Sequence, residues 1–212
     1  MKTEPPSLSS GNAFCTVNSV PRAFSENARW NCSSVAQGIN RTGMDQLCAV
    51  AQVSKRTAYQ HFSGKDDLVA EYLRRFDPDV MAGVFDRTDL TPRERLLAVF
   101  EVPTSGPEEL TPLCPYIAAT VEIHDPEHPA SQYARDYKLA IAARLAETAR
   151  EAGAPHPEQL GEQLALLLDG ASARTRVLNA ESFPTAAAIA TILINNALPT
   201  PPWPQKSKTT TA

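Results

Sequence analysis

Residues 42–65, TGMDQLCAVAQVSKRTAYQHFSGK, constrain the fold of this chain more than any other segment. Met44, Leu47 and Ala51 recur at the spacing of one helical face, and Cys48 continues that face. A second short amphipathic stretch follows after a tight turn, and the start of a third comes directly after it. The pattern predicts two short helices in succession, followed by a longer one.

The starts of all three predicted helices carry capping signals. Ser54 precedes the second helix, where its hydroxyl can accept a hydrogen bond from a free backbone N–H. The pairs Thr42–Asp45 and Ser63–Asp66 each place a hydroxyl three residues before a carboxylate, as in a capping box. We therefore expect side chains to cap all three helices.

The second helix is basic and rich in hydroxyl groups. Ala58 and Phe62 lie four residues apart and are expected to face the core, together with Met44 and Leu47. Arginine can form two hydrogen bonds with guanine, and lysine, hydroxyl groups and helix N-termini suit phosphate, so the predicted partner is double-stranded DNA. Each polar residue could instead be a cap, a half-buried ring or a solvated helix end. The candidate DNA-binding residues are Thr42, Lys55, Arg56, Thr57, Tyr59, His61 and Lys65.

The chain as a whole is predicted to be all-α, because apolar residues repeat at helical spacing and no alternating strand pattern occurs. Further helices are expected over residues 22–37, 68–76 with a bent extension past Pro78, 92–100, 114–123, 130–152, 157–178 and 185–198. The predicted parts are an irregular segment 1–21, a DNA-binding head 22–76, a helical regulatory and dimerisation body 77–198, and a flexible tail 199–212.

The charge of the chain is distributed unevenly. Its net charge is −4, yet residues 38–76 hold six basic and four acidic residues, and residues 77–212 carry a net charge of −7. A mildly basic head on an acidic body suits a protein that touches phosphate at one end only. Chance distribution of charges accounts for the difference equally well.

Other classes of protein find little support in the sequence. No apolar run approaches the roughly 18 residues of a membrane span, and MKTEPPSLSSG lacks the apolar stretch of a signal peptide. The four cysteines lack metal-ligand spacing, so we expect reduced thiols, a cytoplasmic location and no membrane contact.

A metal or catalytic interpretation is also disfavoured. Cys114, Glu122, His124 and His128 fall within fifteen positions, but the prolines at 126 and 129 prevent one helix from presenting both histidines. The chain lacks G-x-S-x-G, H-E-x-x-H and a glycine-rich phosphate loop. We therefore predict no metal site, no cofactor and no enzymatic activity.

Residues 38–76 resemble the DNA-binding head of the TetR family of repressors, most clearly in Tyr-x-His-Phe-x-x-Lys at 59–65. Residues 113–198 resemble the C-terminal half of one branch of that family through LCPYIAATVEIHDPEHPA and QLALLLDGA. The resemblance implies a homodimer that binds a near-palindromic operator, with Tyr59 and His61 mainly on phosphate. The matching residues of the head are Gly38, Thr42, Met44, Asp45, Leu47, Ala51, Val53, Ser54, Lys55, Tyr59, His61, Phe62, Lys65 and Leu68.

The same resemblance implies two features of the body. One is an apolar pocket for an unknown small molecule, which weakens operator binding by preferring the non-binding state. Amphipathic placement suggests the lining residues Phe100, Tyr116, Thr120, Tyr137 and Arg174. The other is a four-helix dimer interface in helices 157–178 and 185–198, whose near all-round hydrophobicity also fits the monomer core. Its candidate residues are Leu164, Leu167, Leu168, Ala171, Ile189, Ile192 and Leu193.

Two features depart from the family pattern. The family's first helix precedes the position of Gly38, where this chain reads SENARWNCSSVAQ with a weak apolar face. Gln52 stands where the family often has glycine, and a left-handed conformation there would cost about 1–2 kcal/mol. The alternative function is therefore a dimeric small-molecule-binding or protein-interaction module with a disabled head.

Overall fold

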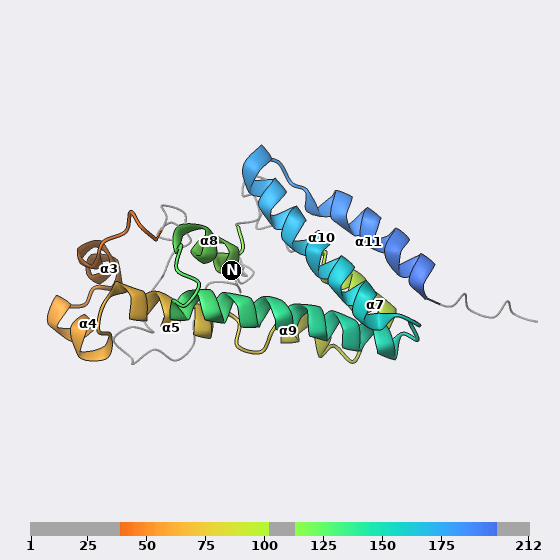
Figure 1. The fold of residues 1–212 in the computed structure, drawn as a ribbon, viewed down its shortest axis with the longest axis horizontal. Helices are drawn as coiled ribbons and strands as arrows, with labels where there is room; N and C mark the ends of the chain where they lie inside the picture. The colour runs from red at the N-terminus through yellow and green to blue at the C-terminus, as the bar shows by residue number, and fades with distance from the viewer. Residues whose placement is uncertain (1–38, 102–112, 199–212) are drawn as a thin grey trace, which may run out of the picture. The chain divides into compact units, whose positions relative to one another are not determined.

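The computed structural model of the chain describes residues 39–101 and 113–198. These residues form nine α-helices, and no strand occurs among them, so the all-α prediction is confirmed (Figure 1). The predictions for residues 22–37 and for both chain ends lie outside the described residues. In chain order the helices are α3 (Met44–Ala51), α4 (Lys55–His61), α5 (Lys65–Phe76), α6 (Ala82–Phe85), α7 (Pro92–Ala98), α8 (Pro115–Glu122), α9 (Pro129–Glu151), α10 (Pro157–Leu178) and α11 (Phe183–Ala197).

Proline sets the start of most helices after α6. The first residue of α7, α8, α9 and α10 is a proline, and Pro184 lies in the first turn of α11. Proline suits this place because its fixed φ is helical and its missing N–H has no partner in the first turn. The helices predicted from residues 92, 114, 130, 157 and 185 are therefore confirmed to within two residues at their starts.

Helix α5 ends at Phe76, so the predicted extension past Pro78 is wrong. Asp77 leaves the helical region with φ −149° and ψ 74°, and a proline disfavours that region for the residue before it. Val80 and Met81 then adopt positive φ angles of 50° and 56°. The chain therefore turns here, and only the short helix α6 follows.

One compact unit of the described chain consists of residues 39–80, 113–139 and 172–181. Within it, α3 and α4 lie at one end of α5 (Figure 1). Its core joins α5, α8 and the start of α9, because buried side chains from all three pack together. These are Val69, Ala70, Leu73, Tyr116, Ala119, Ala130 and Ala134.

A second compact unit consists of residues 81–101, 140–171 and 182–198. Leu96, Leu145, Leu164 and Ile194 are fully buried in the fold, and burial of such a side chain stabilises it by about 1.5–3 kcal/mol. A side chain at Gly161 would come within 2.8 Å of α9 backbone atoms, so α9 and α10 pack closely at this glycine. This grouping follows contacts rather than chain order, and the predicted head and body remain a prediction.

Candidate nucleic-acid interface

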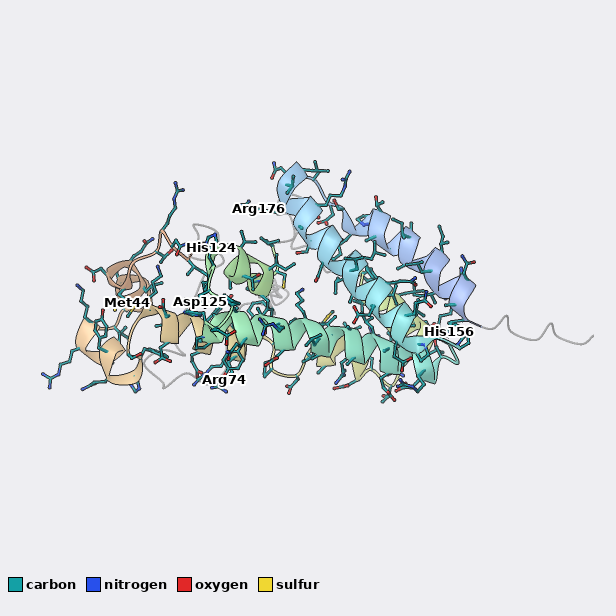
Figure 2. The ribbon with its side chains drawn as sticks, viewed as in Figure 1. Met44, Arg74, His124, Asp125, His156 and Arg176 are labelled. Carbon is teal, nitrogen blue, oxygen red and sulfur yellow. The ribbon has the colours of Figure 1, made fainter. Side chains whose placement is uncertain are left out.

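Helices α3 and α4 pack around a small core of their own. Cys48 and Ala58 are buried at its centre, and Leu47 is buried on the same face of α3. Figure 2 labels Met44 at the start of α3. The core placement predicted for Met44, Leu47 and Phe62 is confirmed. The partly buried neighbours of the central pair are Met44, Val53 and Phe62.

The turn between α3 and α4 passes through the left-handed region. Gln52 has φ 55° and ψ 37°, and its N–H donates to the carbonyl of Ala49 at 3.2 Å. The N–H of Val53 donates to the carbonyl of Cys48 at 3.0 Å, which closes the end of α3. The left-handed conformation considered for Gln52 is therefore confirmed, with a cost of about 1–2 kcal/mol for a residue other than glycine.

Ser54 fixes the start of α4. Its Oγ accepts a hydrogen bond from the backbone N–H of Thr57 at 3.0 Å, as predicted for an N-cap. The Oγ1 of Thr57 also lies 2.8 Å from the Ser54 Oγ, so the two hydroxyls share a hydrogen bond. Thr57 is half-buried, and any contact of its hydroxyl with DNA competes with this bond.

The outer face of α4 presents several polar side chains to solvent. Arg56 and His61 are exposed, and Tyr59 is 53% exposed. Gln60 is exposed as well, and it lies four residues after Arg56, hence on the same side of the helix. Its amide could pair with adenine, as the guanidinium of Arg56 could with guanine. The sequence prediction omitted Gln60, although its spacing from Arg56 was a usable signal.

Lys55, the first residue of α4, is paired with an acidic residue of α3. Its Nζ lies 2.5 Å from the Oδ1 of Asp45. The hydrogen bond to the Asp45 carboxylate raises the pKa of Lys55 above its ordinary value. The lysine predicted to meet DNA is thus partly neutralised by its own chain.

The structure places Thr42 below the surface, since its side chain is only 3% exposed. The predicted capping box of Thr42 with Asp45 is wrong, because Gly43 and not Thr42 is the N-cap of α3, and a glycine has no side chain that could cap the helix. A phosphate contact at this end would therefore use backbone N–H groups and not the Thr42 hydroxyl.

Lys65 is the first residue of α5 and is partly exposed. The predicted capping box of Ser63 with Asp66 is wrong, because Gly64 is the N-cap and has no side chain. Asp67 instead accepts a hydrogen bond from the N–H of Ser63 at 3.1 Å. Two carboxylates lie in the first turn of α5, so Lys65 is the one basic side chain at this helix start that could attract phosphate.

Among the predicted ligand residues, Tyr116 of α8 and Tyr137 of α9 lie together. Their rings stack with centroids 3.8 Å apart and planes 12° from parallel. The Tyr137 hydroxyl donates to Asp77 at 2.5 Å, and the Tyr116 hydroxyl donates to the carbonyl of Leu73 at 2.9 Å. Burial raises the pKa of both phenols. Both hydroxyls therefore stay protonated and act as hydrogen-bond donors. Both bind residues at the C-terminal end of α5.

The other three predicted ligand residues do not join this pair. Phe100 is buried in the second compact unit. Thr120 is exposed, and its hydroxyl donates to the carbonyls of Tyr116 and Ile117 within its own helix. Arg174 is exposed on α10. Only Tyr116 and Tyr137 are thus brought together by a described contact, and the role of all five residues in ligand binding stays a prediction.

Two further contacts join Asn40 to α8 and Asp66 of α5 to the residue before α9. The N–H of Asn40 donates to the Glu122 carboxylate at 2.8 Å, and the Asn40 amide donates to the Glu122 carbonyl at 3.1 Å. The Nε2 of His128 lies 3.7 Å from a carboxylate oxygen of Asp66. Sequence patterns gave no signal for either contact, because the partners are more than sixty residues apart.

Among the four residues that fall close together in the sequence as possible metal ligands, Glu122 and His128 make hydrogen bonds within the fold. His128 accepts a hydrogen bond from the N–H of Ala130 at 3.0 Å and so caps α9. His124 lies in the connection between α8 and α9 (Figure 2). No group of three metal-ligating side chains occurs in residues 39–101 and 113–198.

The predicted dimer residues divide into a buried and an exposed set. Leu164 and Ala171 are buried in the monomer, whereas Ile189 and Ile192 of α11 are exposed, Ile192 by 60%. Leu166 of α10 is 76% exposed and was absent from the prediction, because its neighbours in LALLL are equally apolar. The remaining candidates, Leu167, Leu168 and Leu193, are partly buried.

Comparison with known proteins places this arrangement in context. Residues 35–72 match the family model of bacterial regulatory proteins, tetR family. The crystal structure of sav143 from Streptomyces avermitilis, described as a TetR transcriptional regulator, is 34% identical. It covers 74% of this chain and 87% of that chain, with a TM-score of 0.61.

Two further relatives are similar. SCO4454, a TetR-family transcriptional regulator from Streptomyces coelicolor, is 26% identical, covers 76% of this chain and 88% of its own, and has a TM-score of 0.66. The transcriptional activator FasR of Mycolicibacterium smegmatis is 39% identical over 69 residues, 32% of each chain. The match thus spans about a third of the length of FasR. Among the helices that the structure describes, none is long and apolar enough to cross a membrane.

Proposed function

Because the chain belongs to the TetR family of DNA-binding transcriptional regulators, we propose that it is a homodimeric repressor that a small molecule releases from its operator. Membership of this family also confirms that the chain is a regulator and not an enzyme. The observation that carries the proposal is the exposed polar face of α4, held by the Ser54 cap and the α3–α4 core.

In this proposal α4 enters the major groove of DNA as the recognition helix. Arg56 pairs with the N7 and O6 of guanine, and Gln60 on the same face contacts a neighbouring base. Tyr59 and His61 hold phosphate at the groove edge, and Lys65 adds a further phosphate contact. Phosphate contacts set the position of the head, and base contacts give the sequence preference.

A dimer is needed because one head neutralises few phosphates and binds weakly. The apolar side chains exposed on α10 and α11, Leu166, Ile189 and Ile192, support this part of the proposal. Single exposed apolar residues are ordinary on a surface, but a group on two neighbouring helices favours a partner. A second copy of the chain would cover them and supply the second head for a near-palindromic operator.

The hydrogen bonds from Tyr116 and Tyr137 to the end of α5 support control of DNA binding by a ligand. Tyr116 and Tyr137 bind Leu73 and Asp77, at the C-terminal end of the helix that follows α4. A small molecule that binds beside the stacked rings and prefers a different position of α5 would shift the population toward the non-binding state.

The test is binding of the full chain to a labelled duplex that carries the DNA upstream of its own gene. Fluorescence anisotropy at several salt concentrations would compare it with a scrambled duplex. Arg56→Ala should lower operator affinity by about 5- to 150-fold for each bound head, the equivalent of one bidentate base contact per head. Arg176→Ala, the same change at an exposed arginine of α10, should leave the affinity unchanged. Equal binding of both duplexes by the unchanged chain would contradict the proposal and favour the disabled-head alternative.

The similarity to FasR supports a second candidate, a transcriptional activator. Both functions use the same DNA contacts, so binding alone does not separate them. A reporter gene behind the bound sequence does, because deletion of the regulator raises expression under a repressor and lowers it under an activator.

A further inference from the structure

Asp45 is the single carboxylate of the sequence between residues 39 and 65, a stretch that also contains Arg41, Lys55, Arg56 and Lys65. A carboxylate in a segment that approaches DNA repels phosphate and weakens binding. The place of Asp45, in the first turn of α3, therefore requires a physical account.

The structure provides that account through the ion pair of Asp45 with Lys55. The two side chains meet at 2.5 Å, and they are 74% and 59% exposed, respectively. Exposed ion pairs contribute little to the stability of a fold, so stability alone does not explain this one. The pair joins the first turn of α3 to the first residue of α4, so it holds Lys55 beside the proposed recognition helix.

We propose that Asp45 is a positioning residue for DNA recognition, a role that rests on the proposed function of α4. It neutralises Lys55 and holds the ammonium against the start of α3. Lys55 then donates hydrogen bonds to DNA as part of an ion pair that has no net charge. It therefore adds little to the electrostatic binding of non-specific DNA. The consequence is a head that discriminates better between its operator and other DNA.

Counterion release makes this role measurable. Non-specific binding is almost entirely electrostatic, and the slope of log affinity against log salt is about −0.9 for each phosphate that the protein neutralises. A lysine that keeps its carboxylate partner adds no net charge and so leaves this slope unchanged. Arg56, for which residues 39–101 and 113–198 supply no ion-pair partner, contributes in full.

The experiment compares Asp45→Asn with the unchanged full-length chain on a non-specific duplex over a range of salt concentrations. Release of Lys55 should steepen the slope by about 0.9 for each bound head. If the two proteins bind equally at 1 M salt, the variant should bind non-specific DNA about 8-fold more tightly at 0.1 M for each bound head. Operator affinity should rise by less, so the ratio of operator to non-specific affinity should fall.

Two controls separate this role from a general effect of charge. Asp136→Asn removes the same charge from an exposed position of α9 and should leave the slope unchanged. The change Asp45→Asn should also have no effect on the slope when Lys55→Ala is already present. Melting curves would show that all variants remain folded.

Either of two results would overturn the proposal. One is a slope for Asp45→Asn equal to that of Asp136→Asn. The other is an equal effect of Asp45→Asn with and without Lys55, which would make Asp45 a simple source of repulsion. If the unchanged chain shows no preference for the operator, that result would count against the proposed function. The slopes of log affinity against log salt on non-specific DNA would still decide the role of Asp45.

Discussion

Gln52 carries the backbone strain of the α3–α4 turn, with φ 55° and ψ 37°. Glycine removes this strain of about 1–2 kcal/mol but loses more entropy on folding, by roughly 0.5–1 kcal/mol. We expect Gln52→Gly to raise the free energy of unfolding by a net of about 0.5–1 kcal/mol, because the exposed glutamine side chain packs little. Urea unfolding followed by circular dichroism measures the change.

The matched control is Gln163→Gly, the same exchange at an exposed position inside α10. Its backbone is helical, so glycine should lower the free energy of unfolding there by about 1 kcal/mol. The two variants should differ in sign. A loss of stability in both would show that the turn at Gln52 is not strained.

Tyr137 ties α9 to the end of α5 through its hydrogen bond to Asp77. Tyr137→Phe removes a donor from a partly buried carboxylate, so it should lower the free energy of unfolding by about 1–3 kcal/mol. Tyr116→Phe is the matched control, because its hydroxyl donates to the neutral carbonyl of Leu73 and its loss should cost about 0.5–1.5 kcal/mol. Thermal or urea unfolding measures both. A larger loss for Tyr116→Phe would argue against Asp77 as the stronger anchor.

Helices and their starts follow from signals that lie within a few residues of each other. The Ser54 hydroxyl caps α4 by accepting a hydrogen bond from the N–H of Thr57, three residues later. Helices α8 and α9 each begin at a proline. The tie between Asn40 and Glu122 spans 82 positions of the chain, and no local pattern specifies such a pairing. The helices α3, α4 and α5 could therefore be predicted from the sequence, whereas the contacts of this segment with α8 and with the start of α9 could not.

Apolar helices pose a different difficulty, because composition does not distinguish a core from an interface. Leu164 and Leu166 lie two residues apart in the same apolar run, yet the first is fully buried and the second is 76% exposed. Helical spacing turns them by about 200°, so one faces inward and the other outward. Only the packed structure identifies which side of α10 is available for a second copy of the chain.

Substitution of Ile192 in α11 tests whether the chain associates into a dimer. Ile192→Asp places a charge on the proposed interface, where burial without a partner is costly, and should convert the dimer to a monomer in analytical ultracentrifugation. Leu139→Asp is the matched control, since Leu139 and Ile192 are both 60% exposed, and it should leave the dimer intact.

The monomer should bind the operator with about half the salt slope of the dimer, because one head contacts half as many phosphates. A dimer that survives Ile192→Asp would place the interface on another face, and an unchanged slope would mean that a single head accounts for binding.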